Sequence, residues 1–220
     1  MRTHYHYSCD VMTKKGQNRR DQYIRAAIDF VDVRGIAGLT MRALGEELGV
    51  DPSAVYKYFP SKEALLDALL NEIIRPVAEL EFREKLPRNN VIEICQALRN
   101  SFREHPSLAG IFASAVGNFP NGLMLTRHII VQLQVMGLRG ENLVRMYQSL
   151  EGYTLGASVF DSGGDPDTWT IRQMRYQFFD IPEFTDAGVS PDEVKRITDE
   201  AFLGTLNLLL DQCEKLATKS

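Results

Sequence analysis

The sequence predicts an all-α protein, with an N-terminal three-helix unit that contains a helix-turn-helix and a larger helical C-terminal domain. Three observations support this fold class. Apolar residues recur at i, i+3, i+4 and i+7, capping residues and Pro or Gly breaks separate these segments, and no segment alternates convincingly like a strand. At 220 residues, with 44% hydrophobic and 25% charged side chains, the chain has a globular composition and is long enough to bury a core.

Residues 1–17 show no hydrophobic periodicity and are predicted to form a flexible arm, and Met12 offers an alternative start that would exclude residues 1–11. In this arm, His4, His6 and Cys9 lack a fourth ligand and a scaffold, so no metal site is expected. The basic residues of this region suit either contact with DNA phosphates or a solvated charged tail; they are Lys14, Lys15, Arg19 and Arg20.

The predicted N-terminal domain, residues 18–62, begins with a helix from Asn18 to Arg34 that ends at Gly35. Two short helices joined by a tight turn follow in residues 39–62, LTMRALGEELGVDPSAVYKYFPSK. The predicted core of this domain is apolar at helical spacing and consists of Ile24, Ile28, Val31, Leu39, Leu44, Leu48, Val55 and Phe59.

The turn of the helix pair carries its own signals. Gly49 is predicted to stop the first helix, and Asp51 and Pro52 are predicted to start the second as N-cap and N1 residues. The second helix is expected to bury Val55 and to expose small, hydroxyl-bearing, phenolic and cationic side chains, namely Ser53, Ala54, Tyr56, Lys57 and Tyr58. Such a helix can offer donors to base edges and phosphates, although most helix pairs with a Gly turn are structural.

The run from Ile24 to Leu70 closely resembles the DNA-binding domain of the tetracycline-repressor (TetR) family of bacterial regulators. The resemblance is carried, without gaps, by IRAAIDFVDVRGIAGLT, MRALGEELGVDPSAVYKYF and SKEALLDALL. It implies that the residues at eight positions contact DNA: Thr40, Arg42, Ser53, Ala54, Tyr56, Lys57, Tyr58 and Lys62. It also implies a small-molecule effector and a dimer formed through the last two long helices.

The distribution of charge supports contact with DNA at one end of the protein. Residues 1–62 contain ten Lys or Arg and seven Asp or Glu, a balance of +3, whereas residues 63–220 contain 15 and 22, a balance of −7. The basic end would attract a duplex and the acidic remainder would repel it.

Residues 63–220 are predicted to form the effector-binding and dimerisation domain, entered through a connecting helix at residues 63–82 that kinks or stops at Pro76. A capping-box-like pair, Asn90 and Glu93, predicts the start of the next helix. The DSGGDPD segment after Phe160 is predicted to be a loop. The helices expected in this domain span about 90–105, 107–116, 121–136, 141–160, 168–179 and 190–216.

Two C-terminal segments, residues 150–160 and 201–210, are apolar or small nearly all the way round, so each must be covered on two sides. We interpret them as an isologous dimer face within a four-helix bundle, although the centre of a monomer's core is the alternative. A dimer would also supply two recognition helices for half-sites about 34–36 Å apart. The residues assigned to this face are Gly152, Leu155, Gly156, Val159, Gly204, Leu206 and Leu209.

The middle helices combine aromatic residues and Met with scattered polar side chains. This mixture suits an apolar ligand pocket with a few orienting hydrogen bonds, although such residues more often form plain core. The candidate pocket residues are Phe102, Phe112, Phe119, Met124, His128, Gln132, Tyr147, Glu151 and Trp169.

The remaining signals exclude several classes of function. The cysteines, Cys9, Cys95 and Cys213, have no CxxC spacing and are expected to be reduced thiols in the core, with a redox sensor as the alternative. The sequence has no nucleophile elbow, HExxH, P-loop or Rossmann motif, so neither an enzyme nor a cofactor is expected. No apolar run is long enough to span a membrane and the N-terminus lacks an apolar signal region, so we expect a cytoplasmic protein.

The hypothesis that best joins these observations is a homodimeric repressor that covers a palindromic DNA operator and leaves it when a small molecule occupies the C-terminal domain. Two alternatives remain open. One is a DNA-binding regulator without a small-molecule effector, and the other is a helical ligand-binding protein whose helix-turn-helix is structural only.

Overall fold

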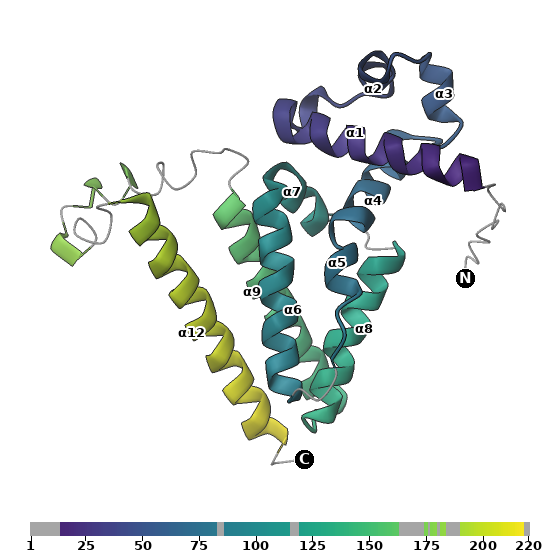
Figure 1. Ribbon diagram of the computed structural model, residues 1–220. Coiled ribbons are helices and arrows are strands. Elements are labelled where there is room, and N and C mark those ends of the chain that lie inside the picture. Colours follow the sequence, from purple (N-terminus) through teal and green to yellow (C-terminus); the bar gives the residue numbers. More distant parts are fainter. Residues whose placement is uncertain are drawn as a thin grey trace.

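The computed structural model describes residues 14–82, 86–114, 119–162, 174–175, 177–179, 181–183 and 190–217. Over these residues the protein consists of helices and their connections, without a strand, which confirms the predicted all-α class. A small N-terminal unit lies across one end of a larger group of helices (Figure 1). Within the same residues, no helix is both long and apolar enough to cross a membrane.

The N-terminal unit consists of α1 (Lys14–Gly38), α2 (Met41–Leu48) and α3 (Pro52–Tyr56). Helix α1 begins four residues before the predicted start at Asn18, so residues 14–17 are helical rather than part of an arm. These four residues add no apolar periodicity, which is why the pattern missed them. At Gly35, where the helix was predicted to end, the backbone breaks at φ 72° and ψ 165°, and one further turn leads to Gly38.

The predicted core of this unit is confirmed. Of its eight residues, Leu48 is half-buried and the other seven are buried: Ile24, Ile28, Val31, Leu39, Leu44, Val55 and Phe59. They belong to one continuous core that also includes the apolar face of α4 (Lys62–Ile73). The small unit therefore gains stability from the connecting helix, as its size requires.

Three consecutive helices start at an N-cap residue whose side chain accepts a backbone hydrogen bond. Thr40 Oγ1 accepts from the Ala43 amide at 3.0 Å, and Ser61 Oγ accepts from the Ala64 amide at 3.2 Å. Between them, Asp51 caps α3. These caps fix where each helix begins, because the first amides of a helix have no partner within it.

The connecting helix is interrupted near its proline. Helix α4 ends at Ile73, and α5 (Arg75–Ala78) follows after Ile74. Because Pro76 has no amide hydrogen to continue the helical ladder, the break falls just before it, close to the predicted kink. Helix α4 packs against α1, and α5 packs against α8 (Pro120–Val135), so this connection joins the two parts of the molecule.

The C-terminal domain is arranged around α6 (Pro87–Glu104), which packs against α8, α9 (Gly140–Ser162) and α12 (Pro191–Ala217) (Figure 1). Helix α7 (Pro106–Ser114) packs against both α1 and α9. The predicted start of α6 at Asn90 is wrong: Asn90 lies inside the helix, is buried, and donates from Nδ2 to Gln132 Oε1 at 2.9 Å. The predicted helix at 168–179 lies mostly outside the described residues.

A buried ion pair ties three of these helices together. The Arg99 guanidinium on α6 pairs with Asp161 on α9 and, at 2.7 Å, with Asp199 on α12, and it stacks over the Phe202 ring at 4.5 Å. Asp161 was predicted to lie in a loop but occupies the last turn of α9. Removal of one member of such a buried pair leaves an unpaired charge, which costs about 3–5 kcal/mol.

Candidate nucleic-acid interface and inner cavity

The helix predicted to recognise DNA lies at the outer end of the molecule, beside α2 and away from the C-terminal domain (Figure 1). Its anchor is Val55, which is fully buried, as predicted. On its outer side Ser53 and Lys57 are exposed and Tyr56 is 51% exposed, while Ala54 is half-buried. A hydroxyl, a phenol and a cation are therefore available on one short helix.

The start of α3 is fixed by Asp51. Its Oδ1 accepts a hydrogen bond from the Ser53 amide at 2.8 Å, and hydrogen bonds from the Ser53 side chain and backbone lower the pKa of Asp51. The cap is therefore present above the ordinary pKa of a carboxyl group and is lost as the pH falls through the lowered value. At neutral pH the helix begins at a fixed position.

Two candidate residues at the start of α2 remain accessible. The Thr40 hydroxyl accepts the capping hydrogen bond and keeps its own hydrogen for another acceptor, such as a phosphate oxygen. Arg42 Nε donates to Glu46 Oε1 at 2.9 Å, and both side chains are exposed. An exposed i, i+4 ion pair contributes only about 0.3–0.5 kcal/mol, so a phosphate can readily replace Glu46.

Two other candidates are engaged within the protein. The Tyr58 ring is half-buried and meets the buried Tyr23 ring edge to face, with centroids 5.3 Å apart. The prediction that Tyr58 lies wholly outside the packed faces is wrong, because α1 passes beside the end of α3. Lys62 is also half-buried, and its Nζ donates to the carbonyl oxygen of Ile36 at 3.4 Å.

A cavity of about 30 Å³ lies between α6, α7, α8 and α9. Most of its lining is apolar, and the polar groups belong to α6, α8 and α9. The lining residues are Cys95, Leu98, Phe112, Gly122, Leu125, Thr126, Ile129, Tyr147, Leu150, Glu151, Thr154 and Leu155. It holds little more than one or two water molecules, so an effector must be small or must spread these side chains.

Hydrogen bonds link the polar groups along one side of the cavity. The Tyr147 hydroxyl donates to Glu151 Oε1 at 2.6 Å and lies 3.2 Å from Thr126 Oγ1. Burial and the adjacent Glu151 raise the pKa of Tyr147 to about 12, and burial raises the pKa of the Cys95 thiol to about 11. Both groups are therefore neutral at physiological pH, and Cys95 lacks the thiolate that a redox sensor needs.

The structure brings only part of the predicted pocket together. Phe112, Tyr147 and Glu151 line the cavity. Phe102 and Phe119 are instead buried against Phe112. The other described candidates lie elsewhere: Met124 is exposed, the His128 ring meets Phe82, and Gln132 binds Asn90. Trp169 lies outside the described residues.

Several cavity residues were missed. Thr126 and Thr154 line it from α8 and α9, and Gly122 lies where a Cβ atom would come within 2.6 Å of the Phe119 ring. A small polar residue in a helix has no periodic signal that marks it as a ligand contact. Only the crossing of α8 over α9 brings these side chains to the same space.

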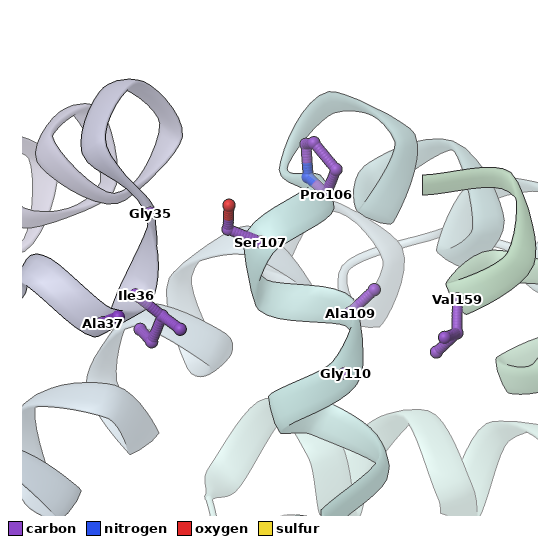
Figure 2. A pocket seen from close by; sticks show the side chains of 8 residues that line it. All are labelled: Gly35, Ile36, Ala37, Pro106, Ser107, Ala109, Gly110 and Val159. Atoms are coloured by element: carbon purple, nitrogen blue, oxygen red, sulfur yellow. The ribbon is translucent and has the colours of Figure 1, made fainter. Parts of the chain in front are cut away.

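A second, larger space of about 430 Å³ lies where the two parts of the molecule meet. Figure 2 shows Ile36 and Ala37, at the end of α1, facing the first turns of α7, with Val159 of α9 also contributing. Beside this junction, His105 Nδ1 lies 2.8 Å from Asp32 Oδ2 and so joins the two parts directly. No sequence pattern predicted this cleft.

Several residues of the faces proposed for dimerisation lie on the surface of the subunit. A Cβ atom at Gly152, Gly156 or Gly204 would meet nothing within 4 Å. Val159 is exposed, and Leu209 is half-buried. Two residues that the prediction missed, Phe160 and Leu208, are 70% and 69% exposed.

The structure contradicts one assignment to the dimer face and gives a second residue of that face another neighbour. Leu206 is fully buried in its own subunit, because it lies about 200° around α12 from Gly204 and therefore faces the core. Leu155 lines the inner cavity. The apolar character of both segments therefore serves the core on one side and an open face on the other.

Comparisons with known proteins agree with this architecture. The family model for bacterial regulatory proteins of the tetR family matches residues 24–69, and the model for the tetracyclin repressor-like C-terminal domain matches residues 86–216. The HTH-type transcriptional repressor DrrR1 of Streptomyces coeruleorubidus is 27% identical over 139 residues, which are 63% of this chain and 52% of that protein. The alignment thus spans about half the length of DrrR1.

Two further relatives match this chain over a larger share of their own length. The class A tetracycline repressor from transposon 1721 of Escherichia coli is 30% identical over 154 residues, 66% of this chain and 67% of that repressor. The crystal structure of Mycobacterium smegmatis BioQ is 25% identical, with a TM-score of 0.66 over 89% of this chain and 98% of that chain. Because the C-terminal family model alone covers more than half of the chain and the N-terminal model covers the helix-turn-helix, the chain belongs to the TetR family of bacterial regulatory proteins.

Proposed function

We propose that this protein is a homodimeric transcriptional repressor that binds a palindromic operator and is released by a small molecule bound in the C-terminal domain. The observation that carries the proposal is the position of α3, which is capped by Asp51, anchored by Val55 and exposed at the outer end of the molecule. DrrR1 and the class A tetracycline repressor are named as repressors, and BioQ has been crystallised with its double-stranded DNA operator.

Each exposed side chain of the interface has a chemical role on DNA. Ser53, at the start of α3, can donate to base edges or to a phosphate, and Tyr56 and Lys57 can reach the flanking backbone. Thr40 and Arg42, exposed at the start of α2, can add contacts to the phosphate backbone. Because one short helix contacts only a few base pairs, useful specificity requires a second copy on the next half-site.

Release requires that the effector distinguish two arrangements of the dimer. A molecule that binds the DNA-incompetent arrangement about 1–3 kcal/mol more tightly than the DNA-competent one would weaken DNA binding enough for release. Such a coupling would join the cavity in the C-terminal domain to the DNA-binding unit through the α4–α5 connection.

The DNA-binding proposal is tested with duplexes selected from a randomised pool by the full-length protein. Fluorescence anisotropy on the enriched duplex should show that Tyr56→Ala weakens binding about tenfold or more, because a contact worth about 1–3 kcal/mol is removed. Arg127→Ala is the matched control: it removes an exposed cation from α8 and should leave affinity within about twofold.

Two results would count against the proposal. If no duplex is enriched at low salt, the helix-turn-helix is structural and the protein is a helical ligand-binding protein. If Tyr56→Ala and Arg127→Ala behave alike, α3 is not the recognition helix.

A further inference from the structure

The inner cavity has one charged residue among its described lining residues, and that residue lies at the edge. Glu151 is exposed on α9, and the only hydrogen bond described for its carboxylate is the one that Tyr147 donates to Oε1. The other titratable groups of the lining, the Cys95 thiol and the Tyr147 phenol, stay protonated. The described lining of the cavity therefore carries a net negative charge, on its exposed residue Glu151.

The buried polar groups of the cavity lining are the Thr154 hydroxyl and the Cys95 thiol. Thr154 lies one turn beyond Leu150 on α9, is buried, and its Oγ1 makes no hydrogen bond to a nitrogen or oxygen of the described residues. The neighbouring polar group is the Cys95 thiol. A buried hydroxyl without a strong partner is unfavourable, so a bound molecule that supplies a partner gains affinity.

These features set the chemical class of the ligand. A carboxylate ligand would be repelled by Glu151, and the balance of −7 over residues 63–220 adds to that repulsion. A protonated amine would instead pair with the free oxygen of Glu151 while its hydrocarbon body lies against Leu98, Leu125 and the other apolar lining residues. We propose that the effector is a largely apolar amine whose ammonium group binds Glu151. This inference rests on the proposed effector-released repressor and names the ligand class of its cavity.

The test uses three small aromatic probes of similar size and different charge: benzylamine, benzyl alcohol and benzoate. Their binding to the full-length protein is measured by calorimetry without DNA. Because the cavity of about 30 Å³ is smaller than a benzene ring needs, each probe is also tested on Leu125→Ala, which removes a buried lining side chain. A cavity of about 150 Å³ with such a lining binds benzene.

Benzylamine should bind at least about tenfold more tightly than benzoate, because one charge-assisted hydrogen bond changes an affinity by about that factor. Glu151→Gln, in either background, should abolish the preference and leave benzyl alcohol within about twofold. Glu141→Gln, which removes an exposed carboxylate elsewhere on α9, should change none of the three affinities.

Three results would overturn the inference: benzoate binding as tightly as benzylamine, a preference for benzylamine that survives in Glu151→Gln, or no benzylamine binding to either protein. The repressor proposal is judged separately, by release of the selected duplex. Probes that bind with the expected preference but never release DNA would support the ligand class and contradict the effector-released repressor.

Discussion

At the scale of single residues, the packing of the DNA-binding unit depends on a glycine between two closely spaced helices. A Cβ atom at Gly45 would lie 3.0 Å from the Val50 carbonyl oxygen and 3.3 Å from the Pro52 nitrogen. Both are backbone atoms, one in the turn after α2 and one at the first residue of α3, so a shift of either would move the start of the recognition helix. The close approach of these two helices therefore favours glycine at position 45.

We predict that Gly45→Ala lowers the free energy of unfolding by about 1–3 kcal/mol, as overpacking does, and weakens DNA binding. The matched control is Gly110→Ala on α7, where a Cβ atom meets nothing within 4 Å and the better helix propensity of Ala should be neutral or stabilising. Thermal unfolding measures both. Equal effects of the two substitutions would show that the α2–α3 contact is not the cause.

Residue-level prediction succeeded where a signal is local. Gly49, Asp51 and Pro52 mark the ends of α2 and α3 by their own backbone and capping chemistry, and the structure confirms these ends. It failed where a role depends on packing: Leu206 is as apolar as any interface residue, yet it fills the core of its own subunit. The face of a helix is set by its neighbours, which periodicity does not identify.

At the scale of elements, the orientation of the DNA-binding unit depends on how α1 meets α4. The backbone of Gly35, at φ 72°, turns the last part of α1 toward α4, and Lys62 Nζ binds the carbonyl oxygen of Ile36 there. Carbonyls at the end of a helix lack partners within it, so a cation at this place stabilises the helix end. Lys62 therefore positions the unit as well as being a candidate for phosphate contact.

This dual role leads to a prediction that separates Lys62 from Lys57. Lys62→Ala should weaken DNA binding and also lower the unfolding midpoint by about 2–3 °C, because a hydrogen bond of about 0.5–1 kcal/mol is lost. Lys57→Ala, on the exposed side of α3, should weaken DNA binding alone. If both variants keep the wild-type midpoint, the contact with Ile36 does not position the unit.

Element boundaries were predicted best where a proline or an N-cap residue marks the start of a helix. The starts of α4 and α12 follow Ser61 and Ser190, each of which accepts a hydrogen bond from an amide three residues on. The start of α6 was misplaced because Asn90 resembles a cap but is held in the core by Gln132. A polar residue can serve either role, and only the neighbouring helix decides which.

At the scale of the whole molecule, α9 and α12 expose large apolar side chains among the residues that the structure describes. Phe160 and Leu208 are large, apolar and mostly exposed, and the glycines beside them leave room for another helix. Large exposed apolar side chains on two neighbouring helices favour an interface at these faces. A second copy of the chain would bury it and supply the second recognition helix.

We predict that Leu208→Glu converts the dimer to monomers, because a carboxylate would be buried without a partner in the bundle. Leu123→Glu, which places the same charge on the exposed side of α8, should leave the dimer intact. Sedimentation equilibrium measures both. Intact dimers of the Leu208→Glu protein would move the interface to another surface.

The central claim, that two copies of α3 occupy successive major grooves, is tested most directly by a dimethyl sulfate footprint of the selected duplex. The expected result is protection of guanine N7 atoms in two major grooves separated by about 10 base pairs, or a whole number of turns, with both lost in Tyr56→Ala. Protection confined to one groove, or a footprint that Tyr56→Ala does not change, would contradict it.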